Sequence, residues 1–150
     1  MVDRGDCTFE LFDSSVFVEA IADTSGKQDV AKSLINSVIA ADNRVPVVHE
    51  LIVGEVKGFL DSDFFETDVS REMAADRFES YINDFSFIEI DLESFRDELS
   101  FILDEKGRIA SEFNDSLIVA IGLSTDRIDK IHTRDQDWNL KEKGTKINSI

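Results

Sequence analysis

Four acidic residues stand where an ordinary surface charge would not be expected. Asp13 lies in ELFDSSVFVEAI, where an apolar strand gives way to an apolar helix, and Asp115 opens the hydrophobic helix of FNDSLIVAIG. Glu55 lies on the apolar stripe of VVHELIVGEVKGFL, because its neighbours three and four residues away on a helix are mainly apolar. Asp135 follows the apolar run KIHT. Carboxylates gathered from such places could bind a metal ion or transfer protons.

Three of the four also have a simpler structural interpretation. Asp13 and Asp115 suit helix N-caps, because an Asp side chain accepts a hydrogen bond from a free amide of the first turn. Asn114 or a nearby serine could cap the second helix equally well, so Asp115 is not needed for that role. Asp135 belongs to a turn after a strand, which is a common place for Asp. No single residue therefore decides between capping and chemistry.

For two of the four positions, a second acidic residue nearby is an alternative candidate for the site. Glu50 precedes Glu55 in the same helix, but it faces Lys57, which makes it resemble an ordinary exposed residue with a salt-bridge partner. Asp137 follows Asp135 and lies further from the strand. Helical geometry therefore favours Glu55, and distance from the strand favours Asp135.

The elements that must position these residues alternate along the chain. Short apolar runs predict buried strands, and segments with helical spacing lie between them. Two of these segments, Ser70–Phe85 and Ser94–Lys106, carry apolar stripes, and a third, Ser111–Leu123, is apolar nearly all round. The predicted strands are Phe9–Phe12, Val45–Val48, Phe87–Ile90, Lys130–Thr133 and, at the end, Lys146–Ile150.

Strands that alternate with helices predict a parallel sheet covered on both faces. We expect one domain over residues 1–150, built as a three-layer α/β/α sandwich around a sheet of four to five strands. In such sheets the functional crevice lies beyond the carboxyl ends of the strands. Asp13 and Asp135 would both lie at that edge.

Composition and net charge indicate the conditions in which the protein folds and where it is located. The 32 acidic and 16 basic residues give a net charge of −16, while 42% hydrophobic residues and 12 Phe suffice for a folded core. Acid spread along the helices indicates adaptation to a salty cytoplasm. A single cysteine, Cys7, excludes a disulfide within the chain, and the lack of a signal segment or a membrane-spanning apolar stretch predicts a cytoplasmic protein.

Four carboxylates in one cleft repel one another unless cations lie among them. Mg²⁺ or Mn²⁺ accepts carboxylate oxygens, keeps several waters and binds readily to phosphate. No set of Cys and His with zinc spacing competes, since the only histidines are His49 and His132. The four acids therefore predict a metal site for phosphate chemistry.

With these motifs in place, the sequence resembles the PIN-domain family of metal-dependent ribonucleases, which includes VapC-type toxins. LFDSSVFVEAI is similar to the family's opening segment, VVHELIVGEV to the helix that carries its Glu, FNDSLIVAIG to its third acidic motif and IHTRDQDW to its Thr-x-Asp closing motif. The closing motif has Trp138 where Phe is more usual. The resemblance implies an acidic quartet of Asp13, Glu55, Asp115 and Asp135, with Ser14 and Thr133 as supporting hydroxyls.

The resemblance also implies a function and partners. We expect an endoribonuclease that uses Mg²⁺ or Mn²⁺ and leaves 5′-phosphate and 3′-hydroxyl ends, most simply the toxin of a VapBC-type pair with a cognate antitoxin and a homodimeric state. Arg134 lies in a comparatively basic segment beside the site and could contact RNA phosphate.

Several alternatives stay open. A ribosomal-RNA processing nuclease of the same fold and a PIN-like scaffold without activity both fit the sequence. A receiver-like phosphoacceptor domain would need an acidic pair after its first strand, where Asp13 stands alone. A haloacid-dehalogenase-type phosphatase would need a second Asp at the position of Ser15.

Overall fold

A parallel sheet and the helices that connect its strands organise the chain. The computed structural model describes residues 7–89, 93, 95–97, 100, 121, 128–134 and 146–150. Within them the elements are β1 (Thr8–Phe12), α1 (Ser14–Ala22), α2 (Gln28–Ala40), β2 (Arg44–Val48), α3 (Glu50–Leu60), α4 (Asp68–Ile82), β3 (Ser86–Phe87), β4 (Lys130–Thr133) and β5 (Lys146–Ser149).

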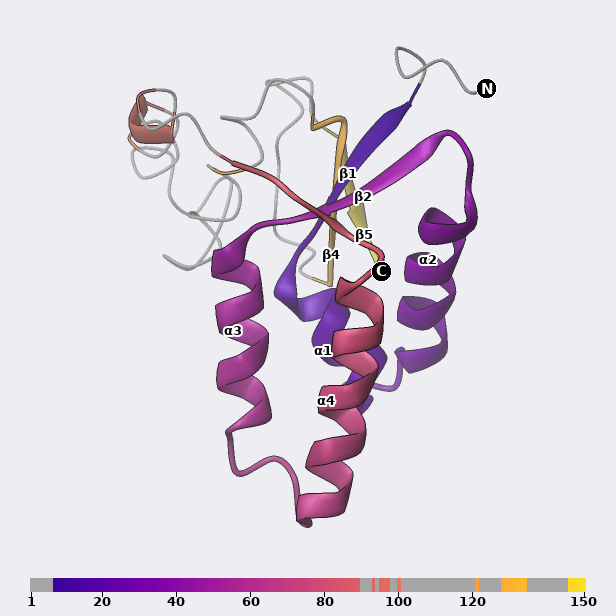
Figure 1. The fold of residues 1–150 in the computed structure, drawn as a ribbon, viewed down its shortest axis with the longest axis vertical. Helices are drawn as coiled ribbons and strands as arrows, with labels where there is room; N and C mark the ends of the chain where they lie inside the picture. Colours follow the sequence, from indigo (N-terminus) through magenta and orange to yellow (C-terminus); the bar gives the residue numbers. More distant parts are fainter. Residues whose placement is uncertain are drawn as a thin grey trace.

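In the described part of the chain the sheet has five strands in the order β3-β2-β1-β4-β5, and every adjacent pair is parallel (Figure 1). Leu11 of β1 lies in register with Val47 of β2 and with Ile131 of β4, so β1 is central. The predicted α/β class and the number of strands are confirmed. The β3 strand begins at Ser86, one residue earlier than predicted, and pairs with β2 to Phe87, while Ile90 of the predicted strand lies outside the described residues.

Two helices follow each of the first two strands of the chain. In Figure 1, α3 and α4 run antiparallel and are joined by a loop at one end of the molecule. The third connection, between β3 and β4, should contain the helices predicted over Ser94–Lys106 and Ser111–Leu123, and most of it lies outside the described residues.

Aromatic side chains from β1, α1 and α4 form a central part of the hydrophobic core. Phe12 of β1 lies 5.2 Å from Phe85 and 6.1 Å from Phe17 of α1, measured between ring centroids, and Phe17 lies 5.4 Å from Phe78 of α4. Burial of each such side chain contributes about 1.5–3 kcal/mol. This contact fixes the start of α1, and therefore Asp13, against the end of β1.

Within the ranges that the structure describes, every helix is too short or too polar to cross a membrane.

Candidate functional site

Asp13 lies at the carboxyl end of β1 and is 4% exposed. It occupies the N-cap position of α1, but its side chain makes no capping hydrogen bond. Instead, Ser15 Oγ donates to Asp13 Oδ2 at 2.6 Å and Thr133 Oγ1 donates to the same oxygen at 3.0 Å. Oδ1 receives a longer contact of 3.5 Å from Ser14 Oγ. The carboxylate is thus held most closely through Oδ2, and the backbone amides of Ser14 and Ser15 also lower its pKa.

Burial raises the pKa of Asp13 above its ordinary value, although the hydroxyls of Ser15 and Thr133 oppose the shift. A buried carboxylate with a raised pKa needs a compensating proton or cation to be stable.

The end of β4 is joined to the start of α1 at this point. The Asp13 amide donates to the His132 carbonyl at 2.8 Å, and the Arg134 amide donates to Ser15 Oγ at 2.9 Å. These bonds place Thr133 directly beside Asp13. The predicted supporting hydroxyls, Ser14 and Thr133, therefore both contact Asp13, and Ser15 makes the shortest contact.

Glu55 approaches the same place from the middle of α3. Its helix neighbours Ile52 and Val56 are fully buried, so Glu55 lies at the border of the apolar face, as its sequence position predicts. Glu55 Oε1 is buried and has no hydrogen-bond partner in the described part of the chain. Burial and the charge of Asp13 raise the pKa of Glu55 to about 7, although a hydrogen bond from Ser14 opposes the shift.

Glu50 differs from Glu55 in its exposure and in its place on α3. It is exposed in the first turn of α3, where a negative charge is favourable at the helix N-terminus. The charge of Asp13 acts on Glu55, whose side chain is half-buried.

Asp115, Asp135 and Asp137 lie outside the described residues, so the structure places only Asp13 and Glu55 of the predicted quartet. Among the described residues there is no group of three or more His, Cys, Asp or Glu side chains that could hold a metal ion. The full quartet stays a prediction.

Arg134, predicted to contact RNA, has a structural partner. Its Nη1 lies 3.1 Å from Glu19 Oε2 and 2.5 Å from Thr24 Oγ1. Glu19 is fully buried, and it also accepts hydrogen bonds from the amides of Ser25 and Lys27 in the loop between α1 and α2. Burial raises the pKa of Glu19, but these hydrogen bonds and that of Thr24 lower it to about 2. The Arg134 side chain, which is 35% exposed, is thereby anchored beside Asp13.

A second buried ionic group, missed from the sequence, crosses the sheet. Glu10 of β1 accepts from Arg44 Nε at 2.6 Å and Nη2 at 2.7 Å, and lies 2.6 Å from His132 Nε2. Asn148 of β5 lies 2.9 Å from His132 Nδ1. Burial raises the pKa of Glu10, but its bonds to Arg44 and His132 lower it to about 2. A signal existed in the sequence, since Glu10 is a charge in the middle of the apolar run FELF.

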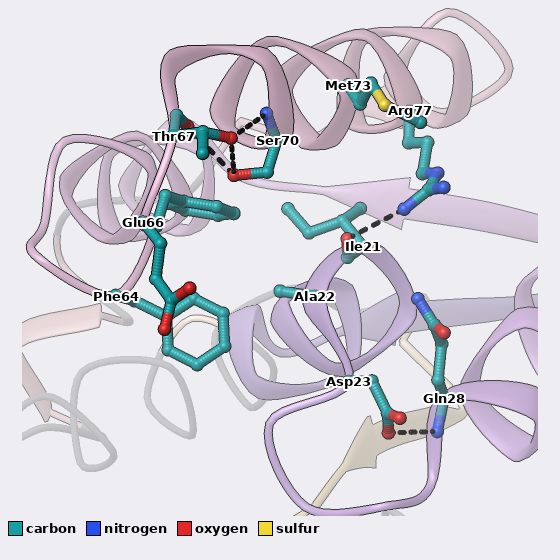
Figure 2. Close-up of a pocket in the computed structure, with 11 residues that line it drawn as sticks. Ile21, Ala22, Asp23, Gln28, Phe64, Glu66, Thr67, Ser70, Met73 and Arg77 are labelled. Atoms are coloured by element: carbon teal, nitrogen blue, oxygen red, sulfur yellow. Dashed lines mark hydrogen bonds between the residues drawn. The ribbon is translucent and has the colours of Figure 1, made fainter.

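An open groove of about 630 Å³ lies away from these acids, between the end of α1 and the start of α4 (Figure 2). Its walls include Ile21 and the exposed apolar side chains of Phe64 and Met73. Arg77 extends across one end and donates to the Ile21 carbonyl at 3.2 Å. Asp23 and Glu66 add negative charge to the lining.

Two solved structures share the fold of this chain. The crystal structure of VapBC2 from Rickettsia felis, bound to a DNA fragment from their promoter, aligns with a TM-score of 0.65 at 15% identity, over 95% of this chain and 98% of that chain. The crystal structure of FitAcB from Neisseria gonorrhoeae aligns with a TM-score of 0.67 at 15% identity, over 93% of this chain and 96% of that chain. No protein-family model and no curated protein matches the sequence. At this identity the likeness concerns the α/β fold alone.

Proposed function

We propose that this protein is a divalent-metal-dependent endoribonuclease of the PIN-domain type, acting as the toxin of a VapBC-type pair. The observation that carries the proposal is the electrostatic pairing of Asp13 with Glu55. The two carboxylates come from separate connections of the sheet, and the charge of Asp13 raises the cost of ionising Glu55. Glu55 also has a buried oxygen with no donor among the described residues.

The residues present fit a hard divalent cation. Asp13 and Glu55 offer only oxygen atoms, which Mg²⁺ and Mn²⁺ prefer. Asp13 Oδ2 accepts from two hydroxyl donors and Oδ1 has a longer contact with Ser14 Oγ, so the proposal assigns the ion to Oδ1. In the proposal, Asp13, Glu55, Asp115 and Asp135 together hold the ion.

A bound Mg²⁺ or Mn²⁺ would supply a water of lowered pKa and stabilise the charge that develops on the scissile phosphate. Hydrogen bonds within the chain hold the Asp13 carboxylate in place for this role. Ser15 and Thr133 fix the rotamer of Asp13, and the bond from the Arg134 amide to Ser15 fixes Ser15 in turn. Attack by water rather than by the ribose 2′-hydroxyl leaves 5′-phosphate and 3′-hydroxyl ends.

A protein partner is part of the proposal. The name VapBC2 matches the type of toxin–antitoxin pair that the sequence resemblance implies. On this chain, the groove beside α4 exposes Phe64 and Met73 within an acidic surface. An antitoxin segment with apolar and basic side chains would complement both features. The proposal also includes the second helical layer of a three-layer sandwich, a homodimeric state and a cytoplasmic location.

The test compares two matched variants of the same helix. Purified protein, Glu55→Gln and Glu50→Gln are incubated with single-stranded RNA and Mn²⁺ in molar KCl, and circular dichroism confirms that each is folded. On RNA that contains only uridine, we expect Glu55→Gln to abolish cleavage and Glu50→Gln to leave it nearly unchanged. Equal cleavage by all three proteins, or products with a 2′,3′-cyclic phosphate formed equally well in EDTA, would overturn the proposal.

A further inference from the structure

A separate hollow opens beside the acids at the carboxyl edge of the sheet. It has a volume of about 460 Å³, and we call it the base pocket, defined by its lining residues His49, Glu50, Phe87, Ile88 and Glu89. None of these residues belongs to the predicted quartet.

The register of the sheet places the base pocket next to Asp13. Leu11 pairs with Val47, so His49 follows β2 at the level where Asp13 follows β1. On the other side of β2, Val48 pairs with Phe87 and the Ile88 amide donates to the Val48 carbonyl at 2.9 Å. Adjacent strands lie about 4.8 Å apart. A nucleotide whose phosphate lies at Asp13 can therefore place a neighbouring base over β2 and β3.

The wall of the pocket includes an aromatic ring in an unusual place. Phe87 lies on the edge strand and is 52% exposed, although it stands at the functional edge of the sheet. Nucleobases stack on exposed aromatic side chains in single-stranded nucleic acid sites. The ring therefore offers a stacking surface for a base.

The charges around the ring select a base over a phosphate. Glu50 and Glu89 are both exposed acids, and a protein with net charge −16 gains little from contact with an RNA backbone. Carboxylates do accept hydrogen bonds from the amino and imino groups of bases. The occupant that these residues favour is consequently a neutral base with N–H donors.

His49 adds one hydrogen-bond donor to the carboxylate acceptors of Glu50 and Glu89. Its Nδ1 accepts a hydrogen bond from the Leu51 amide at 3.1 Å, which assigns the proton of the neutral ring to Nε2. Burial lowers the pKa of His49, against the opposing charge of Glu50, and this favours the neutral ring. The pocket thus presents one N–H donor and two carboxylate acceptors.

We propose that the base pocket binds a guanine of single-stranded RNA, stacked on Phe87 and adjacent to the scissile phosphate. The pairing edge of guanine presents one acceptor, O6, and two neighbouring donors, N1–H and the N2 amino group, which complement this set. Adenine, cytosine and uracil each present fewer donors to the carboxylates. The inference rests on the proposed function and adds a sequence preference to it.

The test measures binding without cleavage. Fluorescence anisotropy in EDTA compares uridine heptamers whose central base is guanine, inosine, adenine or uracil. We expect the guanine oligomer to bind about tenfold more tightly than the uracil one, and inosine, which lacks the N2 amino group, to bind less tightly than guanine. Phe87→Ala should weaken guanine binding about tenfold and flatten the preference.

The matched control is Phe64→Ala, because Phe64 is similarly exposed but lies in the groove beside α4. It should leave RNA binding unchanged, and Glu89→Gln should lower the guanine preference without changing the fold. Equal binding of all four oligomers, or equal effects of Phe87→Ala and Phe64→Ala, would overturn the inference. Guanine preference in a protein that does not cleave RNA with Mn²⁺ would instead refute the nuclease and leave the pocket standing.

Discussion

Replacement of Glu55 by Gln should stabilise the metal-free protein at high pH and leave its stability nearly unchanged at low pH. Burial and the charge of Asp13 raise the pKa of Glu55 from 4.5 to about 7 in the folded state. Between those values the folded protein keeps a proton that the unfolded chain has lost. The free energy of unfolding therefore falls as pH rises through this window, and the loss is complete above pH 7.

The size of the effect follows from the pKa. At about 1.4 kcal/mol for each pH unit, the full difference would be about 3 kcal/mol. Because Glu55 is partly exposed, solvent screening reduces this, and we expect about 1–2 kcal/mol. Glutamine has the same shape without the charge, so Glu55→Gln should recover this amount at pH 8.5. In a chain of 150 residues that corresponds to about 2–6 °C in melting temperature.

The assay is urea unfolding in molar KCl with EDTA at pH 5 and pH 8.5, followed by circular dichroism. Glu50→Gln is the control, since Glu50 is exposed, and it should change stability by less than about 0.5 kcal/mol at either pH. A stabilisation by Glu55→Gln that is equal at both pH values, or a destabilisation at pH 8.5, would refute the electrostatic reasoning.

Four further outcomes are expected. Mn²⁺ should raise the melting temperature by mass action, and Asp115→Asn should remove most of that rise; an equal rise in both proteins would place the ion elsewhere. Arg134→Ala should weaken RNA binding in anisotropy measurements more than it lowers metal affinity, whereas equal losses would mean that Arg134 acts only through its ion pair with Glu19. Glu10→Gln should destabilise the protein by about 2–3 kcal/mol in urea, because it breaks the ion pair of Glu10 with Arg44, while an unchanged midpoint would show that the pair adds nothing. Finally, the wild-type melting temperature should rise from dilute to molar KCl as salt screens the net charge of −16, and an unchanged value would remove the support for a salty habitat.

The sequence by itself determined the class of fold and where the strands lie. The predicted strands Val45–Val48 and Lys130–Thr133 became β2 and β4 almost residue for residue, because strands buried on both faces are short and mainly apolar. It also singled out Asp13 as a carboxylate at a strand end, and Glu55 over Glu50 from helical periodicity alone. The exposed Glu50 and the half-buried Glu55 agree with that periodicity.

Only the tertiary structure decided what these side chains contact. The sequence could not show that Asp13 leaves its helix uncapped and accepts bonds from Ser15 and Thr133, because Thr133 is 120 residues away and arrives through the pairing of β1 with β4. Nor could it assign Arg134 to the buried Glu19, or bring Phe87 beside His49. The local hydrophobic pattern of the sequence indicates which face of a helix or strand is buried. The order of strands in the sheet decides which residues that are distant in sequence become neighbours.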